Sequence, residues 1–242
     1  MMLRDEHVRS GEWLFRWRSY PPVVFLLIVL LGTRGYHYPA DSHVLDYWWE
    51  AGCVLLAVLG LAVRGWAVGA AGVGTSGGDR CQQRAEVLNT TGAYAVVRHP
   101  LYLGAFLVWT GTAALTRSVS VVLIVCLVFW IYYERIMTAE EAFLERRFGA
   151  AYRDWADRTP AFFPRRLALT PGTREFRWKR VLRRDYSAWL AVATAMMSIE
   201  LVAESQVHHR LYIDTPWLVG YASVVLAVIL VRALKHWTTV LR

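Results

Sequence analysis

Cysteines and charged residues are both scarce in this sequence, and each shortage argues against a class of protein. Cys53, Cys81 and Cys126 are the only cysteines in 242 residues, and none of them forms a Cys-x-x-Cys pair. An odd set without paired spacing argues against a disulfide framework or a zinc site, so we interpret all three as reduced packing residues. Charged residues make up 19% of the chain and hydrophobic residues 56%. This balance indicates a membrane protein.

Signals for secretion, nucleic-acid binding and metal binding are also missing. The first apolar run, residues 21–31, follows a polar lead with four arginines and has no clear cleavage site, so a retained span is expected. The net charge is +8, but the basic residues flank apolar segments, which favours anionic lipid headgroups over nucleic acid as partners. No metal site is expected, because four histidines have no metal-ligand spacing: His7, His37, His43 and His236.

Long apolar segments predict an all-helical polytopic membrane protein, since roughly 20 apolar residues cross the hydrocarbon core. Six spans are expected near residues 21–38, 46–68, 101–116, 119–136, 187–205 and 215–235. The third is short, and two glutamates interrupt the fifth. With six spans, 24 of the 27 Lys and Arg residues lie on one side, and Arg34, Arg117 and Arg210 lie on the other. The positive-inside rule then places both termini in the cytoplasm, and the Arg- and Ala-rich composition favours a bacterial inner membrane.

The same reasoning divides the chain into three parts. Residues 1–45 hold the N-terminal segment and first span, residues 46–165 the core, and residues 166–242 a basic linker and a C-terminal hairpin of two spans. Two polar segments, residues 69–97 and 137–186, would face the cytoplasm, where a soluble cofactor is available. Far from them, Glu200, Glu204, His208 and His209 form either a polar site at the opposite interface or a simple span end.

The first candidate site follows Gly92-Ala93-Tyr94 and consists of Arg98-His99-Pro100-Leu101-Tyr102-Leu103-Gly104. Pro100 suits the first turn of a helix, because its missing N–H would have no intrahelical partner there. Unpaired backbone N–H groups, the Arg98 guanidinium and the His99 imidazole would then form an anion site at the helix start. The alternative is a juxtamembrane Arg-His pair that contacts lipid headgroups.

The second candidate site is a stripe of residues at helical spacing: Glu134, Met137, Glu141, Leu144, Phe148, Tyr152 and Trp155. A carboxylate on an apolar face needs a specific partner, because burying it unpaired is costly. A sulfonium, an amino group or a ribose hydroxyl could be the partner of Glu141. The alternative is an amphipathic interfacial helix in which Glu141 pairs with a nearby arginine. Downstream, the segment Thr159–Pro164 would end the helix and form an apolar wedge against the membrane or a pocket.

Together these motifs resemble the isoprenylcysteine carboxyl methyltransferase family and, more distantly, the phospholipid N-methyltransferases. The resemblance covers about 100 residues, from the second span to Pro164, and rests on Arg98-His99-Pro100-x-Tyr102-x-Gly104, Glu140-Glu141-x-x-Leu144, Phe148-Gly149-x-x-Tyr152 and the Pro-aromatic-Pro segment. The stretches around Thr75-Ser76 and Leu88–Thr91 are also similar to bacterial lipid A 1-phosphate methyltransferases.

The resemblance implies an integral membrane enzyme that binds S-adenosyl-L-methionine at the cytoplasmic ends of its core helices. It implies catalytic roles for Arg98, His99 and Glu141. The cofactor-binding residues that it implies are Tyr94, His99, Pro100, Tyr102, Gly104, Glu140, Glu141 and Tyr152. Arg98 would hold an anionic group of cofactor or substrate, Glu141 a cofactor hydroxyl or amine, and His99 either contacts the cofactor or assists transfer.

The expected reaction is O-methylation of a phosphate or carboxylate on a membrane-embedded lipid, without a metal. Four alternatives remain from the sequence. The acceptor could be a prenylated cysteine carboxylate or an amino headgroup, because the named families use both. The chain could be an NADPH-dependent membrane reductase, to which the His-Pro motif is distantly similar, or a non-catalytic scaffold that binds acidic lipids through its basic loop.

Overall fold

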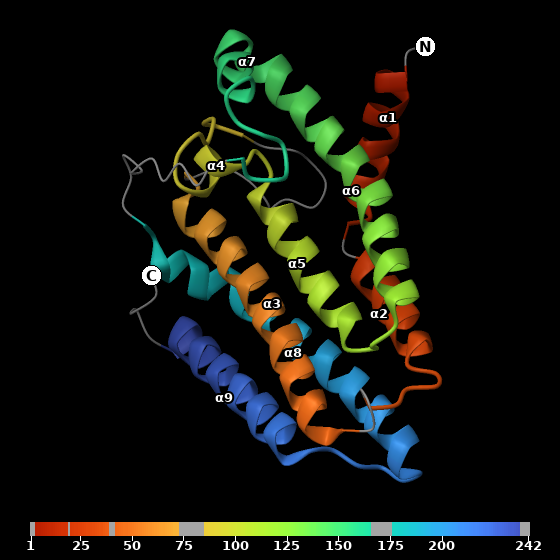
Figure 1. Ribbon diagram of the computed structural model, residues 1–242. Coiled ribbons are helices and arrows are strands. Elements are labelled where there is room, and N and C mark those ends of the chain that lie inside the picture. The colour runs from red at the N-terminus through yellow and green to blue at the C-terminus, as the bar shows by residue number, and fades with distance from the viewer. Residues whose placement is uncertain (1–2, 19, 39–41, 73–84, 166–175, 238–242) are drawn as a thin grey trace.

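The computed structural model describes residues 3–18, 20–38, 42–72, 85–165 and 176–237, and every regular element in these ranges is a helix (Figure 1). The helices are α1 (Leu3–Arg16), α2 (Pro21–Gly32), α3 (His43–Ala70), α4 (Ala93–Val96), α5 (Pro100–Ala114), α6 (Val119–Phe148), α7 (Ala150–Ala156), α8 (Trp178–His208) and α9 (Thr215–Trp237). The all-helical prediction is therefore confirmed for the described residues. Cys81 and Thr75-Ser76 lie outside them.

Four of these helices, α3, α6, α8 and α9, are long and apolar enough to cross a membrane, and α1 with α2 would add a fifth as one bent span. The predicted first span is shorter than expected: α2 stops at Gly32, because the chain turns through residues 33–35, and Arg34 lies outside it. The third predicted span corresponds to α5, which has 15 residues. Four or five spans are thus supported, and six stays a prediction.

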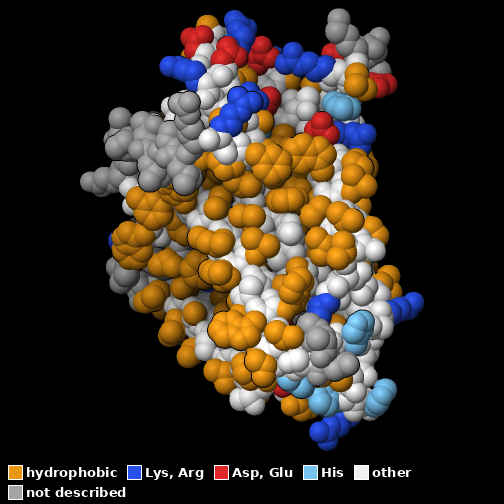
Figure 2. Space-filling view, in the orientation of Figure 1, with side chains coloured by type: hydrophobic (Ala, Val, Ile, Leu, Met, Phe, Trp, Pro, Cys, Tyr) orange, Lys and Arg blue, Asp and Glu red, His pale blue; other side chains and the backbone are white. Residues whose placement is uncertain are grey.

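The outer surface has the character expected of a chain in lipid. Figure 2 shows a broad band of hydrophobic side chains below an end that is rich in charged groups. Leu55 of α3, Leu127 of α6 and Leu226 of α9 are each more than half exposed, at 59%, 61% and 58%. An apolar surface this continuous is stable only when another apolar phase covers it.

Glycines bring α3 and α5 together along most of their length. A Cβ atom on Gly104 would lie 2.6 Å from the Gly60 carbonyl oxygen, and one on Gly111 would lie 2.7 Å from the Cys53 carbonyl oxygen. Backbones that approach this closely pack through van der Waals contact alone, as small residues allow in membranes. Cys53 is buried in this interface, as a packing role requires, and Cys126 is half-buried in α6.

Aromatic rings form the core between α2, α5 and α6. Phe25 lies 4.8 Å from Trp109 and 6.4 Å from Phe129, measured between ring centroids. Phe106 meets Phe129 edge-on at 5.3 Å. Such pairs stabilise a helix arrangement beyond the apolar area that they bury. This core holds the start of α5 opposite the second half of α6.

The spacing of the second candidate stripe predicts one continuous helix, but in the structure the stripe is divided between two helices. α6 ends at Phe148, and Gly149 has a φ of +56° and separates it from α7. Only glycine adopts this conformation at little cost, so the helix breaks there and α7 turns back over the end of α6 (Figure 1). Tyr152 and Trp155 therefore come from a second, short helix above Glu141.

Candidate functional site

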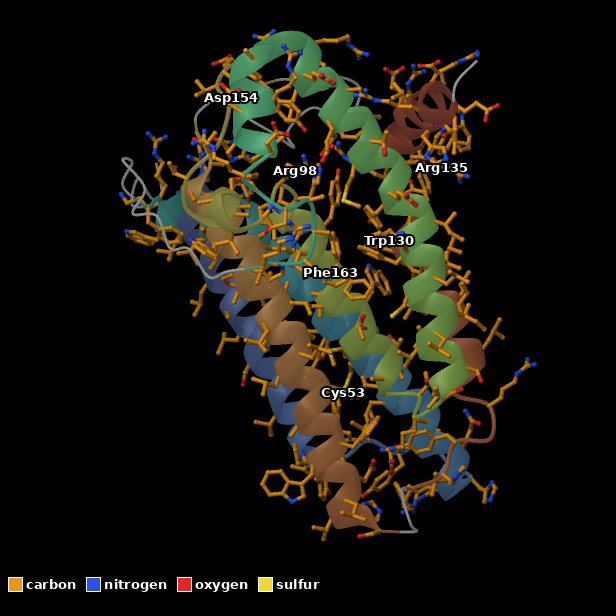
Figure 3. The ribbon with its side chains drawn as sticks, turned by 45° about the horizontal axis from the view of Figure 1, so that its top comes forward. Cys53, Arg98, Trp130, Arg135, Asp154 and Phe163 are labelled. Atoms are coloured by element: carbon orange, nitrogen blue, oxygen red, sulfur yellow. The ribbon has the colours of Figure 1, made fainter. Side chains whose placement is uncertain are left out.

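The segment after α7 folds back onto the residues that precede α5. The Arg98 N–H donates to the Pro160 carbonyl at 2.9 Å, and the His99 N–H donates to the Ala161 carbonyl at 3.1 Å. Phe162 anchors this segment in the aromatic core, 5.7 Å from Phe106. Figure 3 shows Phe163 near Trp130 of α6, and the two rings stack with 6.2 Å between their centroids. The Pro-aromatic-Pro segment is thus a structural wall of the candidate site.

This pairing corrects one part of the sequence interpretation. The backbone N–H groups of Arg98 and His99 are occupied, and those of Tyr102 and Leu103 donate to the His99 carbonyl at 3.2 and 3.0 Å. Pro100 has no N–H at all. The backbone donors at these four positions are therefore not free to bind an anion, because the returning chain and the His99 carbonyl accept from them. Anion binding here depends on side chains.

The side chains of His99 and Glu141 are in contact although the two residues are 42 positions apart in the sequence. The His99 Nε2 atom lies 2.9 Å from Glu141 Oε1, and Arg98 Nε lies 3.2 Å from the same oxygen. The His99 side chain is nearly buried, whereas Arg98 and Glu141 keep 20% and 26% exposure. The alternative interpretation paired Glu141 with a nearby arginine of an interfacial helix, whereas in the structure its arginine is Arg98, from a distant segment. The pair is partly shielded from water but can still be reached by a solute.

A second acid and a phenol complete the cluster. The Tyr102 hydroxyl donates to Glu140 Oε1 at 2.8 Å, and His99 Nδ1 lies 3.7 Å from Glu140 Oε2. The imidazole thus stands between two carboxylates, one on each side of its ring. Neighbouring carboxylates hold an imidazole in a fixed orientation. Among the residues predicted to bind cofactor, these three and Glu141 are in direct mutual contact.

α7 contributes two buried aromatic side chains, and Tyr152 lies close enough to Glu141 and Arg98 to feel their charges. Tyr152 and Trp155 are 4% and 8% exposed, and their rings meet edge-on at 5.7 Å. The Tyr152 hydroxyl and the Trp155 Nε1 atom are buried with no hydrogen-bond partner among the described residues. Burial raises the pKa of Tyr152, so its hydroxyl remains a donor at physiological pH. Buried polar atoms without partners are costly, so these two donors are available to a bound solute or water.

The other predicted cofactor residues have different surroundings. Pro100 is buried as the first residue of α5, and the Tyr94 backbone N–H donates to the Thr91 carbonyl at 3.3 Å in the turn that leads to it. Gly104 packs against α3 rather than toward Glu141, with a virtual Cβ 2.6 Å from the Arg64 Cγ atom as well. Asn89 accepts from the Gly72 N–H at 2.9 Å. A role in binding cofactor stays a prediction for Tyr94, Pro100 and Gly104, as it does for His99, Tyr102, Glu140, Glu141 and Tyr152.

The sequence interpretation missed α1, which packs along the second half of α6. Arg4 pairs with Glu145 at 2.7 Å, and the Tyr132 hydroxyl donates to the Leu14 carbonyl at 2.9 Å. Arg18, at the end of this segment, lies close enough to act electrostatically on Glu140 and Tyr102. An amphipathic pattern with acidic residues in its first turn, Asp5 and Glu6, was the available signal.

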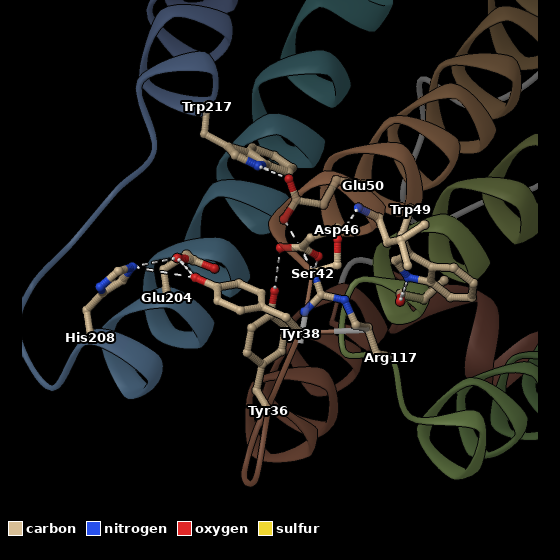
Figure 4. A network of polar contacts seen from close by, with 12 residues as sticks. Tyr36, Tyr38, Ser42, Asp46, Trp49, Glu50, Arg117, Glu204, His208 and Trp217 are labelled. Atoms are coloured by element: carbon tan, nitrogen blue, oxygen red, sulfur yellow. Dashed lines mark hydrogen bonds and ion pairs between the residues drawn. The ribbon is translucent and has the colours of Figure 1, made fainter. Parts of the chain in front are cut away.

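A second polar cluster lies at the opposite end of the bundle (Figure 4). Arg117 forms ion pairs with Asp46 and, at 3.6 Å, with Glu50. The Tyr38 hydroxyl donates to Glu204 at 2.8 Å, and His208 Nε2 lies 3.4 Å from the same carboxylate. The structure thus brings Glu204 and His208 together, as one of the two interpretations expected, whereas His209 is exposed. In the described ranges no three His, Cys, Asp or Glu side chains are arranged to hold a metal ion.

Comparison with known proteins gives matches to one part of the chain. Residues 48–151 match the family model described as phospholipid methyltransferase. The nickel-cobalt-cadmium resistance protein NccN of Alcaligenes xylosoxydans xylosoxydans is 42% identical over 78 residues, which cover 32% of this chain and 36% of that protein. The protein-S-isoprenylcysteine O-methyltransferase of Schizosaccharomyces pombe is 37% identical over 78 residues, which cover 32% of this chain and 33% of that protein. No solved structure matches.

The match spans about a third of the length of these curated relatives, and the family model covers less than half of the chain. The segment matched by the family model includes Arg98, His99, Tyr102, Glu140 and Glu141, and it ends one residue before Tyr152. Residues 48–151 therefore confirm the resemblance to the membrane methyltransferases of the phospholipid and isoprenylcysteine type.

Proposed function

We propose that this chain is an integral-membrane methyltransferase that uses S-adenosyl-L-methionine to methylate a phosphate or carboxylate oxygen of a membrane-embedded lipid at the cytoplasmic face. The observation that supports it most is the joint contact of Arg98 and His99 with Glu141, beneath an aromatic cover. Two segments that lie far apart in sequence, and that resemble a methyltransferase family independently, form one polar cluster. A lipid-binding scaffold needs no such convergence.

The residues of this cluster fit the chemistry of the cofactor. S-adenosyl-L-methionine has a carboxylate, an ammonium group and ribose hydroxyls, and each needs a partner of a different kind. Arg98 can hold a carboxylate, and Glu140 or Glu141 can accept from an ammonium or hydroxyl group. The unpaired Tyr152 hydroxyl and Trp155 indole N–H supply two further donors.

The chemical demands on the protein are modest. When bound, the cofactor supplies a methyl group activated by its sulfonium, so an anionic acceptor needs no strong general base. The task of the chain is to orient acceptor and donor and to exclude water. Arg98 neutralises an anionic group, the two glutamates fix the orientation of His99, and the aromatic cover from α7 keeps the site dry.

The proposed orientation places this site in the cytoplasm. In the sequence, the range 134–186 that includes Glu141 is the richest in Lys and Arg, with 13 of them. Membrane proteins retain such segments on the cytoplasmic side. The cofactor would then reach the site from the cytosol, and the lipid would reach it from the bilayer.

Calorimetry of the purified protein in detergent tests cofactor binding directly. Wild type should bind S-adenosyl-L-methionine, and Glu141→Ala and Arg98→Ala should each weaken binding at least tenfold while helical content stays unchanged. Glu145→Ala is a matched control one turn further along α6, because Glu145 pairs with Arg4 and Arg153 instead. Absence of binding by folded wild type would remove the proposal, and stabilisation by NADPH alone would favour a reductase.

A second assay identifies the acceptor. Labelled methyl groups should pass from the cofactor into lipid when the enzyme is mixed with a total lipid extract. A carboxyl methyl ester would release the label in mild base, whereas a methyl phosphodiester would keep it. The relative from S. pombe makes a prenylated cysteine carboxylate the principal alternative acceptor, which the same assay tests with a farnesylated peptide. Label in an amino headgroup would instead indicate N-methylation.

A further inference from the structure

A large apolar cavity lies between α3, α8 and α9, on the side of α3 that faces away from α5. Its volume is about 880 Å³, near the upper end of what small-molecule sites usually enclose. Aliphatic and aromatic side chains line it, among them Leu61, Trp189, Val192 and Val224. Glu50 is the only charged residue in this lining as far as the described chain extends. In a membrane, a cavity of this composition takes hydrocarbon rather than water.

One end of the cavity lies beside a cluster of cations. Phe176 and Val181 line it where α8 starts, and the Arg177 N–H donates to the Gly69 carbonyl at 3.1 Å, which ties that start to the end of α3. The first two turns of α8 and the residue before them contain the basic residues Arg177, Lys179, Arg180, Arg183 and Arg184. All of these except Arg180 are exposed. A phosphate or carboxylate headgroup is stabilised at this end.

The opposite end of the cavity is acidic. Glu50 and Trp217 line it there, and the Trp217 indole N–H donates to Glu50 Oε2 at 2.9 Å. Five carboxyl side chains are buried in this region, on Asp46, Glu50, Glu200, Glu204 and Asp214, and Arg117 is the arginine paired with two of them. These carboxyl side chains are buried and offer an anionic headgroup no cationic partner, in contrast to the exposed basic residues at the other end. The two ends therefore select one orientation for an anionic amphiphile.

The basic end is also the end nearest the candidate site. Trp66 lines the cavity, and its Nε1 atom lies 3.6 Å from the position of a Cβ on Gly92. Gly92 precedes α4, which leads within a few residues to Arg98 and His99. A headgroup at this end thus sits beside the segment that enters the proposed catalytic cluster.

We propose that this cavity is the binding site for the hydrocarbon chains of an anionic lipid, held with its headgroup at the Arg177–Arg184 end and its chain ends toward Glu50. The site is built by α8 and α9 together with α3, and α8 and α9 lie outside the segment that matches the methyltransferase family. The C-terminal hairpin is accordingly the element that selects the lipid. The identification of this lipid as the methyl acceptor rests on the proposed function, whereas binding itself does not.

Filling the cavity tests the site, and two glycines make a matched pair. Gly220 of α9 lines the cavity, and Gly52 of α3 does not. A Cβ on either meets nothing within 4 Å, so a side chain is accepted at both positions without a shift of the backbone. Gly220→Phe projects a ring into the cavity, and Gly52→Phe projects one from an exposed helix surface.

Native mass spectrometry of detergent-purified protein would count bound lipids, using phosphatidic acid, phosphatidylcholine and a cationic lipid with identical acyl chains. Wild type should retain phosphatidic acid best and the cationic lipid least. Gly220→Phe should lower retention of phosphatidic acid about tenfold, and Gly52→Phe should match wild type. A double variant, Arg177→Gln with Lys179→Gln, should bind phosphatidylcholine normally but lose the preference for phosphatidic acid.

Each contrary result has a defined meaning. Equal retention of phosphatidic acid by Gly220→Phe and Gly52→Phe would overturn the cavity as the lipid site. A preference of the wild type for the cationic lipid would overturn the proposed orientation of the bound lipid. Thermal unfolding of each variant shows whether it is folded, and Ala193→Phe fills the same cavity from α8 should Gly220→Phe be unstable. Cofactor binding by calorimetry should be unchanged in Gly220→Phe. Lipid retention without cofactor binding would leave the lipid site standing and remove the proposed methyltransferase function.

Discussion

Gly104 of α5 lies against Gly60 of α3 so closely that a Cβ on either residue would come within 2.6 Å of the other's carbonyl oxygen. This contact sets the position of α5, whose first residues follow His99. It also keeps the cavity on one side of α3 and the polar cluster on the other.

Gly104→Val should therefore separate α3 from α5. We expect a loss of about 1–3 kcal/mol in the free energy of unfolding, because overpacking an interface forces backbone shifts. Cofactor affinity should fall as well, since His99 moves with the start of α5. Thermal unfolding and calorimetry would measure both effects. Gly52→Val, at an open position on α3, should leave both unchanged, and a stable Gly104→Val protein with normal affinity would contradict the packing argument.

Tyr152→Phe removes the hydroxyl that has no partner among the described residues. If this hydroxyl bonds the cofactor, affinity for S-adenosyl-L-methionine should fall about five- to tenfold, the value of one hydrogen bond of about 1 kcal/mol. Stability without cofactor should be equal or higher, because a buried unpaired group is lost. Measuring both quantities separates a ligand-binding hydroxyl from one that only supports the fold, which would lower stability and spare affinity.

The same residue predicts a pH dependence. Burial raises the pKa of Tyr152 above its ordinary value near 10, so the neutral hydroxyl is present throughout the physiological range. Its contribution to cofactor binding should stay constant from neutral pH up to pH 10 and be lost only above that range. The ratio of wild-type to Tyr152→Phe affinity, measured as a function of pH, should accordingly be flat. A ratio that declines between about pH 8 and 10 would mean that the ring is solvated.

Arg117→Gln should be severely destabilising. Arg117 pairs with both Asp46 and Glu50, which are 2% and 4% exposed, so its removal leaves two buried carboxylates unpaired. The expected cost is about 3–5 kcal/mol, the range for breaking one half of a buried ion pair. The deficit should shrink as pH falls, because the carboxylates take up protons. Arg210→Gln, at an exposed arginine near the same end, should change stability by no more than a few tenths of a kcal/mol.

The proposed orientation can be tested with a membrane-impermeant maleimide on intact cells. A cysteine introduced at Arg210 should be labelled from outside the inner membrane, and one introduced at Arg147 only after the membrane is opened. Both arginines are exposed, so access depends on the side of the membrane and not on burial. Cys53 is buried and should contribute little background. The reverse labelling pattern would invert the topology and place the cluster of Arg98 and Glu141 outside the cytosol.

Composition and periodicity determine much of the fold in this chain. Long apolar stretches dictate helices, since only helices satisfy every backbone group of a segment in hydrocarbon. Pro100 predicted the start of α5, and the start of the span predicted at residue 119 agrees with the first residue of α6, Val119. The residue types of the candidate site were also readable, because an acid such as Glu141 on an apolar face demands a partner.

Tertiary structure alone decided which partner each group found. The Arg98 and His99 amides are free in any isolated helix start, and they are occupied here only because the chain returns at Pro160 and Ala161. The break at Gly149 depends on a single backbone conformation that spacing does not encode. The docking of α1 on α6 and the packing of α3 against α8 arise from contacts between segments more than a hundred residues apart. Local sequence sets the conformational preference of each segment, whereas these contacts form only when distant segments pack against one another.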